Sequence, residues 1–276
     1  MPLETVHGVE GRLRAAGVPS PRVDAEILVA DVLGLARSEL YSSGRSVSAF
    51  ETEQLDELVG RRLRREPLAY ILGEWGFRWL LLKVDDRALI PRPETEVVVE
   101  RCLAFLGERA EPRVLDVGVG SGAIALAIAD EHEGAHVVAV DSSEQALSLA
   151  RENQARAGVN GRVRLVQGDL LTEVDGPFDL VVSNPPYVTP EEYETLQPEI
   201  RLYEPHEAVV GVGVGTQVAA EARALLRPGG RLVLECGDGQ AAVLAEALRC
   251  LGYAEVVETK DLAGRDRVVE GTWNGS

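Results

Sequence analysis

The chain has 276 residues, and 45 acidic residues against 28 lysines and arginines give it a formal net charge of −17. Hydrophobic residues make up 45% and charged residues 26%, which is ordinary for a globular protein and long enough for a catalytic domain with a smaller partner. Because contacts to phosphate need clustered Lys and Arg side chains, a chain this acidic disfavours non-specific DNA binding.

The cysteines and histidines argue against a disulfide-linked protein and against a metal-binding protein. Three widely separated cysteines without a CxxC pair predict reduced thiols, and four histidines without metal-ligand spacing predict no metal site. No basic segment followed by an apolar stretch opens the chain, and no apolar run reaches the roughly 18 residues of a membrane span. We therefore expect a cytoplasmic protein without a membrane anchor.

Residues 1–75 are predicted to be helical. Apolar residues such as Ile27 and Val32 recur at helical spacing before Gly34, which supplies a helix end. The segment 48–51 (Ser-Ala-Phe-Glu) has the form of a capping box and precedes another apolar helical face. This small module is too polar to carry much chemistry itself.

Residues 76–93 are predicted to form a hairpin linker. Aromatic and aliphatic runs span 75–84, Asp85-Asp86 is expected to turn the chain, and residues 87–90 are expected to pair back. The two prolines of the following segment, 90–96, force an extended backbone before the next helix.

From about residue 112 the chain alternates strands with helices. The strands lack polar alternation, as strands buried on both faces do, which predicts a mostly parallel sheet with helices on both sides in an α/β fold. The expected strands are residues 113–117, 136–140, 163–166, 178–182 and 231–234.

A glycine loop follows the first of these strands. Residues 116–122 (Asp-Val-Gly-Val-Gly-Ser-Gly) stand between a strand and a helix, where glycines let the backbone pass close to a ligand. Its G-x-G-x-G spacing differs from the G-x-G-x-x-G of dinucleotide folds. The alternative is a tight turn without a ligand.

Two aspartates at strand ends add to this pattern. Asp141 ends the second strand and can accept hydrogen bonds from both hydroxyls of a ribose. Alternatively, it is the N-cap or the dipole partner of the following helix. Asp169 follows the third strand and can accept from an adenine amino group, or it is a plain turn residue. Together they predict a nucleoside-containing cofactor, and the glycine spacing favours S-adenosylmethionine over a nicotinamide dinucleotide.

The most specific motif directly follows the fourth strand: Asn184, Pro185, Pro186 and Tyr187. Two prolines fix the backbone and hold the local carbonyls outward. The Asn184 side-chain oxygen and the Pro185 carbonyl can then accept both hydrogens of one planar NH₂ group, while Tyr187 offers it a flat face. Such a site suits an amide or an exocyclic base amine, and the alternative is a proline-rich turn.

These motifs together resemble one family. The NPPY motif at 184–187 with the glycine loop at 116–122 is typical of methyltransferases that modify the amino nitrogen of adenine, cytosine or glutamine. The segment 90–96 (IPRPETE), preceded by 66–73 (EPLAYILG), is similar to the HemK/PrmC family, which methylates the glutamine of the Gly-Gly-Gln motif in peptide chain release factors. The likeness covers nearly the whole chain and continues through residues 203–205, 228–235 and 260–267.

The resemblance implies a partner-docking helical domain at 1–75, a hairpin linker at 76–93 and a seven-stranded, Rossmann-like methyltransferase domain at 94–276. It implies S-adenosylmethionine as the cofactor and release factors 1 and 2 as partners of a monomer, with no nucleic-acid substrate. The residues expected to contact the cofactor are Gly118, Val119, Gly120, Ser121, Gly122, Asp141, Asp169, Leu170 and Asn184. Those expected to contact the glutamine are Arg92, Glu94, Asn184, Pro185, Pro186 and Tyr187.

Three segments leave alternatives open. Residues 211–216 (GVGVGT) and Val119 depart from the family pattern, which expects a Gly-Gly-x-Asp-Gly-like stretch and a threonine. Residues 61–65 (RRLRR) form either a solvated helix face or a docking surface for the release factor or an RNA. The acids of the segment 92–96 are either first-turn acids of the next helix or part of the wall of the substrate cleft.

The sequence therefore predicts methyl transfer from S-adenosylmethionine to the side-chain amide nitrogen of a protein glutamine. An adenine-N6 DNA methyltransferase is the rival enzyme, because it uses the same motif on a flipped base. The charge of −17 and the lack of an extra DNA-reading domain argue against it. A binding module that only senses the cofactor is the non-enzyme alternative.

Overall fold

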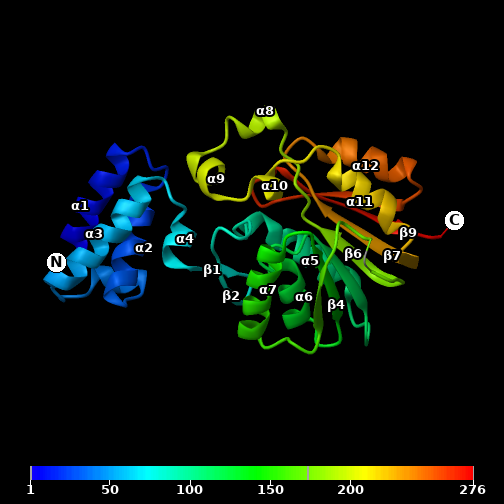
Figure 1. The fold of residues 1–276 in the computed structure, drawn as a ribbon, viewed down its shortest axis with the longest axis horizontal. Coiled ribbons are helices and arrows are strands. Elements are labelled where there is room, and N and C mark those ends of the chain that lie inside the picture. The colour runs from blue at the N-terminus through cyan, green and yellow to red at the C-terminus, as the bar shows by residue number, and fades with distance from the viewer. Residues whose placement is uncertain (1, 173, 276) are drawn as a thin grey trace. The chain divides into compact units, whose positions relative to one another are not determined.

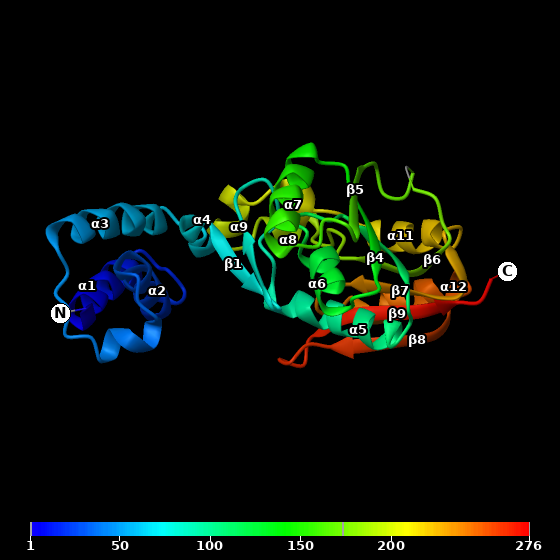
Figure 2. The ribbon, with the colours of Figure 1, turned by 90° about the horizontal axis from the view of Figure 1, so that it is seen from below.

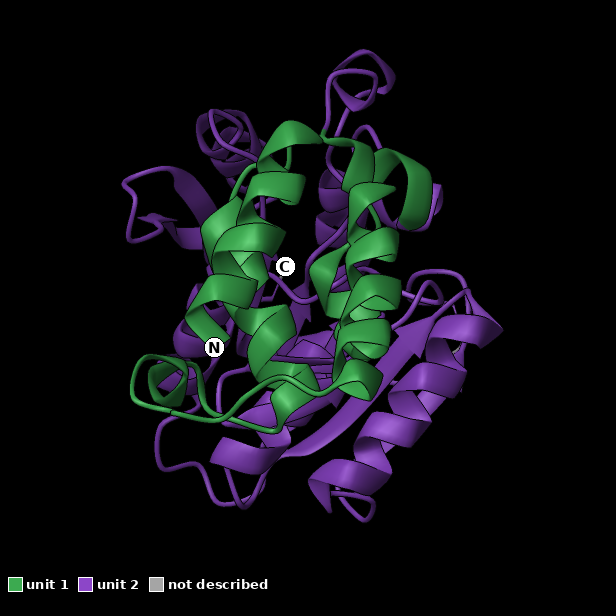
Figure 3. Ribbon diagram, turned by 90° about the vertical axis from the view of Figure 1, so that its left-hand side faces the viewer, with its two compact units in different colours: residues 1–73, 197–203 green, residues 74–196, 204–276 purple. Residues whose placement is uncertain are grey.

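The computed structural model describes residues 2–172 and 174–275, which fold into two compact units. The first comprises the described residues of 1–73 and 197–203, and the second comprises those of 74–196 and 204–276 (Figure 3). No helix within these described stretches combines the length and apolar character that crossing a bilayer needs.

The first unit is helical, as the sequence predicts. The expected capping box is confirmed: the Ser48 side chain accepts the Glu51 N–H, and the Glu51 carboxylate accepts the Ser48 N–H at 2.8 Å. Fully buried Leu13, Leu28 and Val59 stand at the centre of its core. The helices are α1 (Pro2–Ala15), α2 (Pro21–Leu33), the 3-10 helix η1 (Arg37–Tyr41), α3 (Ala49–Leu63), α4 (Leu68–Leu72) and α9 (Pro198–Tyr203).

The basic run at the end of α3 pairs with carboxylates of its own unit. Arg62 is 5% exposed, with its Nε 2.7 Å from Asp24 Oδ2 and its Nη1 2.8 Å from Glu199 Oε1. Arg65 holds the same Glu199 at 2.7 Å, and Arg61 pairs with Glu66. The interpretation of this run as a solvated face is therefore wrong for Arg62, and these ion pairs also occupy the arginines offered as a docking surface.

The second unit contains a two-stranded hairpin and the seven-stranded sheet expected from the resemblance (Figure 1). Its strand order is β5-β4-β3-β6-β7-β9-β8, parallel from β5 to β7, with β9 antiparallel to both neighbours. The strands are β1 (Glu74–Phe77), β2 (Leu80–Lys83), β3 (Arg113–Val117), β4 (His136–Asp141), β5 (Val163–Gln167), β6 (Phe178–Ser183), β7 (Leu226–Glu235), β8 (Ala254–Lys260) and β9 (Asp266–Trp273). The helices are the 3-10 helix η2 (Pro93–Thr95), α5 (Glu96–Leu106), α6 (Ala123–Glu131), α7 (Glu144–Ala157), α8 (Pro190–Tyr193), α10 (His206–Val209), α11 (Val214–Ala222) and α12 (Ala241–Cys250).

Helices cover both faces of this sheet (Figure 2). Helices α5, α6 and α7 bury one face, where Val114 and Val182 lie, while α11 and α12 bury the other, where Leu115 and Val181 lie. The prediction that the strand at 163–166 is buried on both faces is wrong, because β5 is the sheet edge and most of its residues are partly or fully exposed.

The hairpin turns earlier than the sequence predicts. Phe77 pairs with Leu80, so the hairpin turn lies at Arg78-Trp79. The chain does turn at Asp85-Asp86, where the Ala88 N–H donates to the Asp85 carbonyl, but residues 87–90 form no strand, so the expected pairing back is wrong. Arg78 has a φ of 52°, and its guanidinium bonds Glu131 while its N–H bonds the Glu96 carboxylate. These bonds fix a two-residue turn that the local pattern of apolar residues does not reveal.

The sheet topology determines where a ligand can bind. From β3 the chain proceeds outward through β4 to β5, and it then crosses to β6 on the opposite side of β3. Ligands of open α/β sheets bind beyond the carboxyl ends of the strands where the strand order reverses in this way. The ends of β3, β4 and β6 therefore define the place to look for the site.

Arg62→Ala tests the buried ion pairs of the helical unit. The substitution leaves Asp24 buried without its cationic partner, so we expect the free energy of unfolding of this unit to fall by about 3–5 kcal/mol. Urea titration followed by circular dichroism measures the loss. Arg64→Ala, in the same run but exposed, is the matched control, and equal unfolding midpoints for the two variants would contradict the role of Arg62.

Candidate active site

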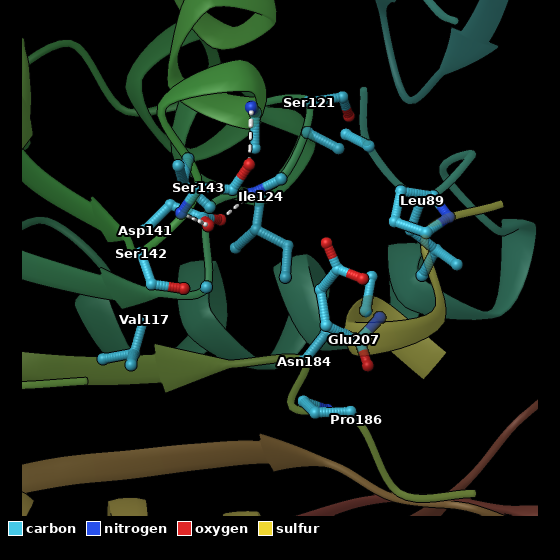
Figure 4. A pocket seen from close by; sticks show the side chains of 18 of the residues that line it. Leu89, Val117, Ser121, Ile124, Asp141, Ser142, Ser143, Asn184, Pro186 and Glu207 are labelled. Carbon is cyan, nitrogen blue, oxygen red and sulfur yellow. Dashed lines mark hydrogen bonds between the residues drawn. The ribbon is translucent and has the colours of Figure 1, made fainter. Parts of the chain in front are cut away.

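A cavity of about 240 Å³ opens at the carboxyl ends of β3, β4 and β6 (Figure 4). Its lining includes loop residues that directly follow these strands and β5, residues 87–92 from the segment before η2, and residues 205, 207 and 208 around α10. The sequence-predicted residues that line it are Arg92, Gly118, Val119, Gly120, Ser121, Asp141, Asp169, Leu170, Asn184 and Pro186.

The glycine loop presents its backbone to this cavity. Gly118 and Gly120 have φ angles of +78° and +54°, and a Cβ built on either would meet nothing within 4 Å. The loop is held by the neighbouring strand β4, because the N–H groups of Gly118 and Val119 both donate to the Val140 carbonyl. Gly122 does not line the cavity: its φ is +92° and a Cβ there would lie 2.8 Å from a Leu126 methyl, so packing against α6 explains this glycine.

Asp141 lines the cavity at the end of β4. Its two carboxylate oxygens accept the N–H groups of Gly120 and Ser143, each at 2.9 Å, which fixes the plane of the group. The helix α7 is capped by the Ser143 side chain, which accepts the Ala146 N–H, so the interpretation of Asp141 as that helix cap is wrong. Burial raises the pKa of Asp141 above its usual value.

These features fit an adenosyl cofactor. The open space beside the glycine backbone gives room for a ligand to approach closely, and each Asp141 oxygen still has a lone pair for a hydroxyl donor. Residues 168–170 line the same cavity, which places Asp169 and Leu170 within reach of the same ligand.

Asp116, near the end of β3, holds the first turn of α6. It is 1% exposed, and its Oδ2 accepts the Ala125 N–H at 3.0 Å, which satisfies one free backbone donor at the start of α6. Burial raises the pKa of Asp116 to about 8, and its other oxygen finds no partner among the described residues. We assign it to the support of α6 because it does not line the cavity.

The NPPY motif forms a corner between two cavities. Asn184 and Pro186 line the first, while Pro185, Pro186 and Tyr187 line a second cavity of about 280 Å³ on the other side. The Ser183 hydroxyl donates to the Val117 carbonyl at 2.6 Å, which ties the end of β6 to the end of β3. The position of Asn184 is thus set by two paired strands.

The divergent segment 211–216 packs against this corner. A Cβ at Gly211 would lie 2.8 Å from Pro186 Cγ, so only glycine allows this close approach. The Gly211 N–H donates to the Val188 carbonyl, and the Gln240 amide donates to the Tyr187 carbonyl at 3.0 Å. The corner is therefore supported on the side away from the first cavity.

The charged residues of the segment 92–96 have different partners. Arg92 pairs with Glu204 at 2.5 Å at the cavity wall. Glu94 pairs with Arg265 at 2.8 Å and does not line the cavity, and Glu96 accepts the Arg78 N–H. Thr95 does line it, so the structure brings Arg92 and Thr95 to the site but not Glu94 or Glu96.

Two acidic residues near the site were missed. Glu207 of the short helix α10 lines the first cavity, and no sequence motif marks it. Glu235 ends the apolar run of β7, a signal of the same kind as Asp141 ending β4, and it lines the second cavity at 1% exposure. Burial raises the pKa of Glu235 to about 7.

The mostly parallel sheet reverses its strand order where the glycine loop, Asp141 and the NPPY corner meet, and this arrangement fits an S-adenosylmethionine-dependent methyltransferase. The family model described as "PrmC N-terminal domain" matches residues 4–73, and "Methyltransferase small domain" matches residues 98–200.

Curated relatives narrow this class. Proteins named release factor glutamine methyltransferase are 40% identical in Caulobacter vibrioides, over 95% of this chain and 93% of that one, and 43% identical in Deinococcus radiodurans, over 94% and 93%. The chain belongs to the release factor glutamine methyltransferase family. A methyltransferase structure from Pyrococcus furiosus shares the fold, with a TM-score of 0.51 and 21% identity over 82% of this chain and all of that one.

Asp141→Ala is expected to weaken cofactor binding. The change removes a fixed pair of charged acceptors, and each hydrogen bond to a charged group is worth about 1.5–3 kcal/mol. We expect the dissociation constant of S-adenosylhomocysteine, measured by calorimetry, to rise by at least about tenfold. Glu144→Ala, an exposed acid at the start of α7, is the control, and an unchanged constant for the Asp141 variant would contradict the assignment.

Glu235→Gln is expected to flatten the pH dependence of stability. Because the pKa of Glu235 is about 7 in the folded state and 4.5 ordinarily, the folded state holds the proton more tightly. The protonated Glu235 side chain therefore adds to the free energy of unfolding. This contribution is complete below pH 4.5 and is lost as the pH rises through 7. The drop in the free energy of unfolding between pH 5 and pH 8 should therefore be smaller in the variant by roughly 1–3 kcal/mol. Exposed Glu258→Gln is the control, and parallel pH profiles would contradict the buried position.

Proposed function

We propose that this protein transfers a methyl group from S-adenosylmethionine to the N5 side-chain amide of the glutamine in the Gly-Gly-Gln motif of peptide chain release factors. The observation that carries the proposal is the corner at 184–187, whose Asn184 side chain lines the same cavity as the glycine loop and Asp141. The names and 40–43% identity of the curated relatives support the choice of substrate.

The chemistry demands positioning more than base catalysis. An amide nitrogen is a weak nucleophile because its lone pair is delocalised into the carbonyl. When bound, S-adenosylmethionine supplies a methyl group on a positively charged sulfur. The sulfur keeps the electron pair of the S–CH₃ bond when the methyl group is transferred. The protein's own task is to fix the nitrogen against that methyl, and such placement supplies roughly 7–11 kcal/mol of a barrier.

Asn184 and Pro185 can perform that placement. The Asn184 Oδ1 and the Pro185 carbonyl accept the two N–H bonds of the carboxamide, which leaves the face of the nitrogen free. Positive charge grows on the nitrogen during transfer, and two fixed acceptors stabilise it. Burial raises the pKa of Tyr187 to about 12, so this phenol stays protonated at neutral pH and packs as a flat surface. The proton then leaves the nitrogen to water.

We assign the remaining predicted residues on the same basis. Gly118 to Ser121, Asp141, Asp169 and Leu170 hold the cofactor, and Arg92 belongs to the wall where the glutamine enters. We propose that the helical domain at 1–75 docks the partner, that release factors 1 and 2 are both substrates and that the enzyme acts as a monomer.

The adenine-N6 DNA methyltransferase alternative is not favoured. The curated relatives above carry the glutamine methyltransferase name. The basic run at 61–65, which offered the strongest cationic patch in the sequence, is engaged by Asp24, Glu66 and Glu199. Arg61, Arg62 and Arg65 therefore have their charges balanced without a phosphate backbone.

Asn184→Ala tests the amide clamp. We expect turnover on purified release factor to fall on the order of 100-fold, the effect of removing one fixed group that stabilises transition-state charge. The dissociation constant of S-adenosylhomocysteine should change less than threefold. Mass spectrometry of the Gly-Gly-Gln peptide measures the methyl group directly, with the exposed Asn160→Ala variant as the control.

Two results would overturn the proposal. Undiminished turnover by the Asn184 variant would exclude the clamp. Methylation of duplex DNA by the unaltered protein, with no mass shift of the release factor, would show that DNA and not the release factor is the substrate.

A further inference from the structure

Charged side chains of both signs line the first cavity. They are Arg87, Arg92, Asp141, Asp169 and Glu207. Whether this set attracts a positive or a negative ligand depends on which of the charges are already balanced by residues that lie outside the cavity. The ion pairs of the described residues answer that question.

Both arginines are balanced by carboxylates outside the cavity. Arg87 Nη1 lies 2.7 Å from Glu152 Oε1, and its Nη2 lies 2.7 Å from Asp85 Oδ2. Arg92 Nη2 lies 2.5 Å from an oxygen of Glu204, whose side chain is 1% exposed. Asp85, Glu152 and Glu204 do not line the cavity. The two positive charges of the lining are therefore neutralised before any ligand binds.

The three acids of the lining have no such balance. Within residues 2–172 and 174–275, no Lys, Arg or His side chain forms an ion pair with Asp141, Asp169 or Glu207, and Asp141 accepts backbone N–H groups instead. Burial raises the pKa of Asp141, and the negative charge of Glu207 raises it further. The cavity therefore presents uncompensated negative charge to its ligand.

Glu207 lies at the end of the cavity next to the NPPY corner. Its helix α10 is tied to the residue that follows the motif, because the Val188 N–H donates to the Val209 carbonyl at 3.1 Å. Figure 4 shows the Glu207 carboxylate among the side chains that line the cavity. Asp169 follows β5, which β4 and β3 separate from β6 in the sheet. Of the unbalanced acids, Glu207 is the one placed to act on a charge at the corner.

The cofactor carries such a charge before methyl transfer and loses it afterwards. S-adenosylmethionine has a positively charged sulfur, whereas the product S-adenosylhomocysteine has a neutral thioether sulfur and is otherwise identical apart from the lost methyl group. A carboxylate near that sulfur attracts the first molecule more strongly than the second. The attraction is reduced by nearby solvent but is not abolished by it.

We propose that Glu207 is a specificity-determining residue that favours the positively charged cofactor over its neutral product, because its unpaired carboxylate lies at the end of the cavity where the methyl group is transferred. Arg92 does not oppose it, since Glu204 balances that charge. The proposal rests on the proposed position of the methyl acceptor at residues 184–187, but not on the identity of the substrate. Methyl transfer itself then weakens the binding of the spent cofactor.

Glu207→Gln tests the proposal, because glutamine keeps nearly the same shape and removes the charge. We expect the dissociation constant of S-adenosylmethionine, measured by calorimetry on the whole protein, to rise by about three- to tenfold. The constant of S-adenosylhomocysteine should rise by less than about twofold, because its sulfur carries no charge. The ratio of the two constants therefore isolates the effect on the charged sulfur.

Two matched variants are the controls. Glu207→Asp keeps the carboxylate, so the ratio of the two constants should stay within about twofold of the unaltered protein. Glu191→Gln removes an exposed acid of α8 that does not line the cavity, so it makes the same change in net charge and should leave both constants unaltered. Thermal unfolding checks that each variant is folded.

Three results would overturn the proposal. Equal rises of both constants in Glu207→Gln would show that Glu207 binds a part common to both molecules. An unchanged constant for S-adenosylmethionine would show that it acts on neither, and a change in Glu207→Asp equal to that in Glu207→Gln would show that shape and not charge matters. These measurements use no methyl acceptor, so they are separate from the failure of the proposed function, which would appear as unmethylated release factor.

Discussion

The site depends on the point where strand β6 ends beside β3. The Ser183 hydroxyl donates to the Val117 carbonyl, so the last residues of the two strands are joined before either loop begins. The glycine loop leaves β3 and the NPPY corner leaves β6 from this junction, and both then line one cavity. The loop proposed to hold the cofactor and the corner proposed to hold the glutamine are therefore placed by the same pair of strand ends.

Rigidity comes from the far side of the corner. Gly211 approaches Pro186 too closely for any larger residue, and Gln240 holds the Tyr187 carbonyl. A weak nucleophile needs accurate placement, and accurate placement needs residues that packing and hydrogen bonds hold in one position. We therefore infer that the glycine-rich segment 211–216 contributes to this placement: it lines the second cavity, and its Val214 also lines the first.

Much of this arrangement follows from local sequence. Buried parallel strands show as apolar runs, and a glycine loop or a carboxylate at a strand end is visible one element at a time, so β3, β4 and their loops can be predicted within a residue or two. The hairpin turn cannot be predicted from local sequence, because Arg78 is fixed by Glu131 and Glu96 from distant parts of the chain. For the same reason the sequence misleads about Arg62 and Arg65, because their partner Glu199 lies more than 130 residues away.

The supports of the site are the hardest to predict. Thr95 and Glu235 belong to different motifs, and only the fold brings them to Asn184 and Tyr187. Thr95 carries no sequence signal by itself, and Glu235 is marked only as an acid that ends an apolar run. A network of side chains from η2, β6 and β7 becomes apparent only when distances are known.

The central claim is that the NPPY corner holds a planar carboxamide by its two hydrogens. A crystal structure of the protein with S-adenosylhomocysteine and a Gly-Gly-Gln peptide tests it most directly. We predict that the glutamine nitrogen lies within about 3.2 Å of both Asn184 Oδ1 and the Pro185 carbonyl oxygen, the upper limit of an N–H···O hydrogen bond. A glutamine side chain bound elsewhere, or bound with its oxygen toward Asn184, would contradict the account.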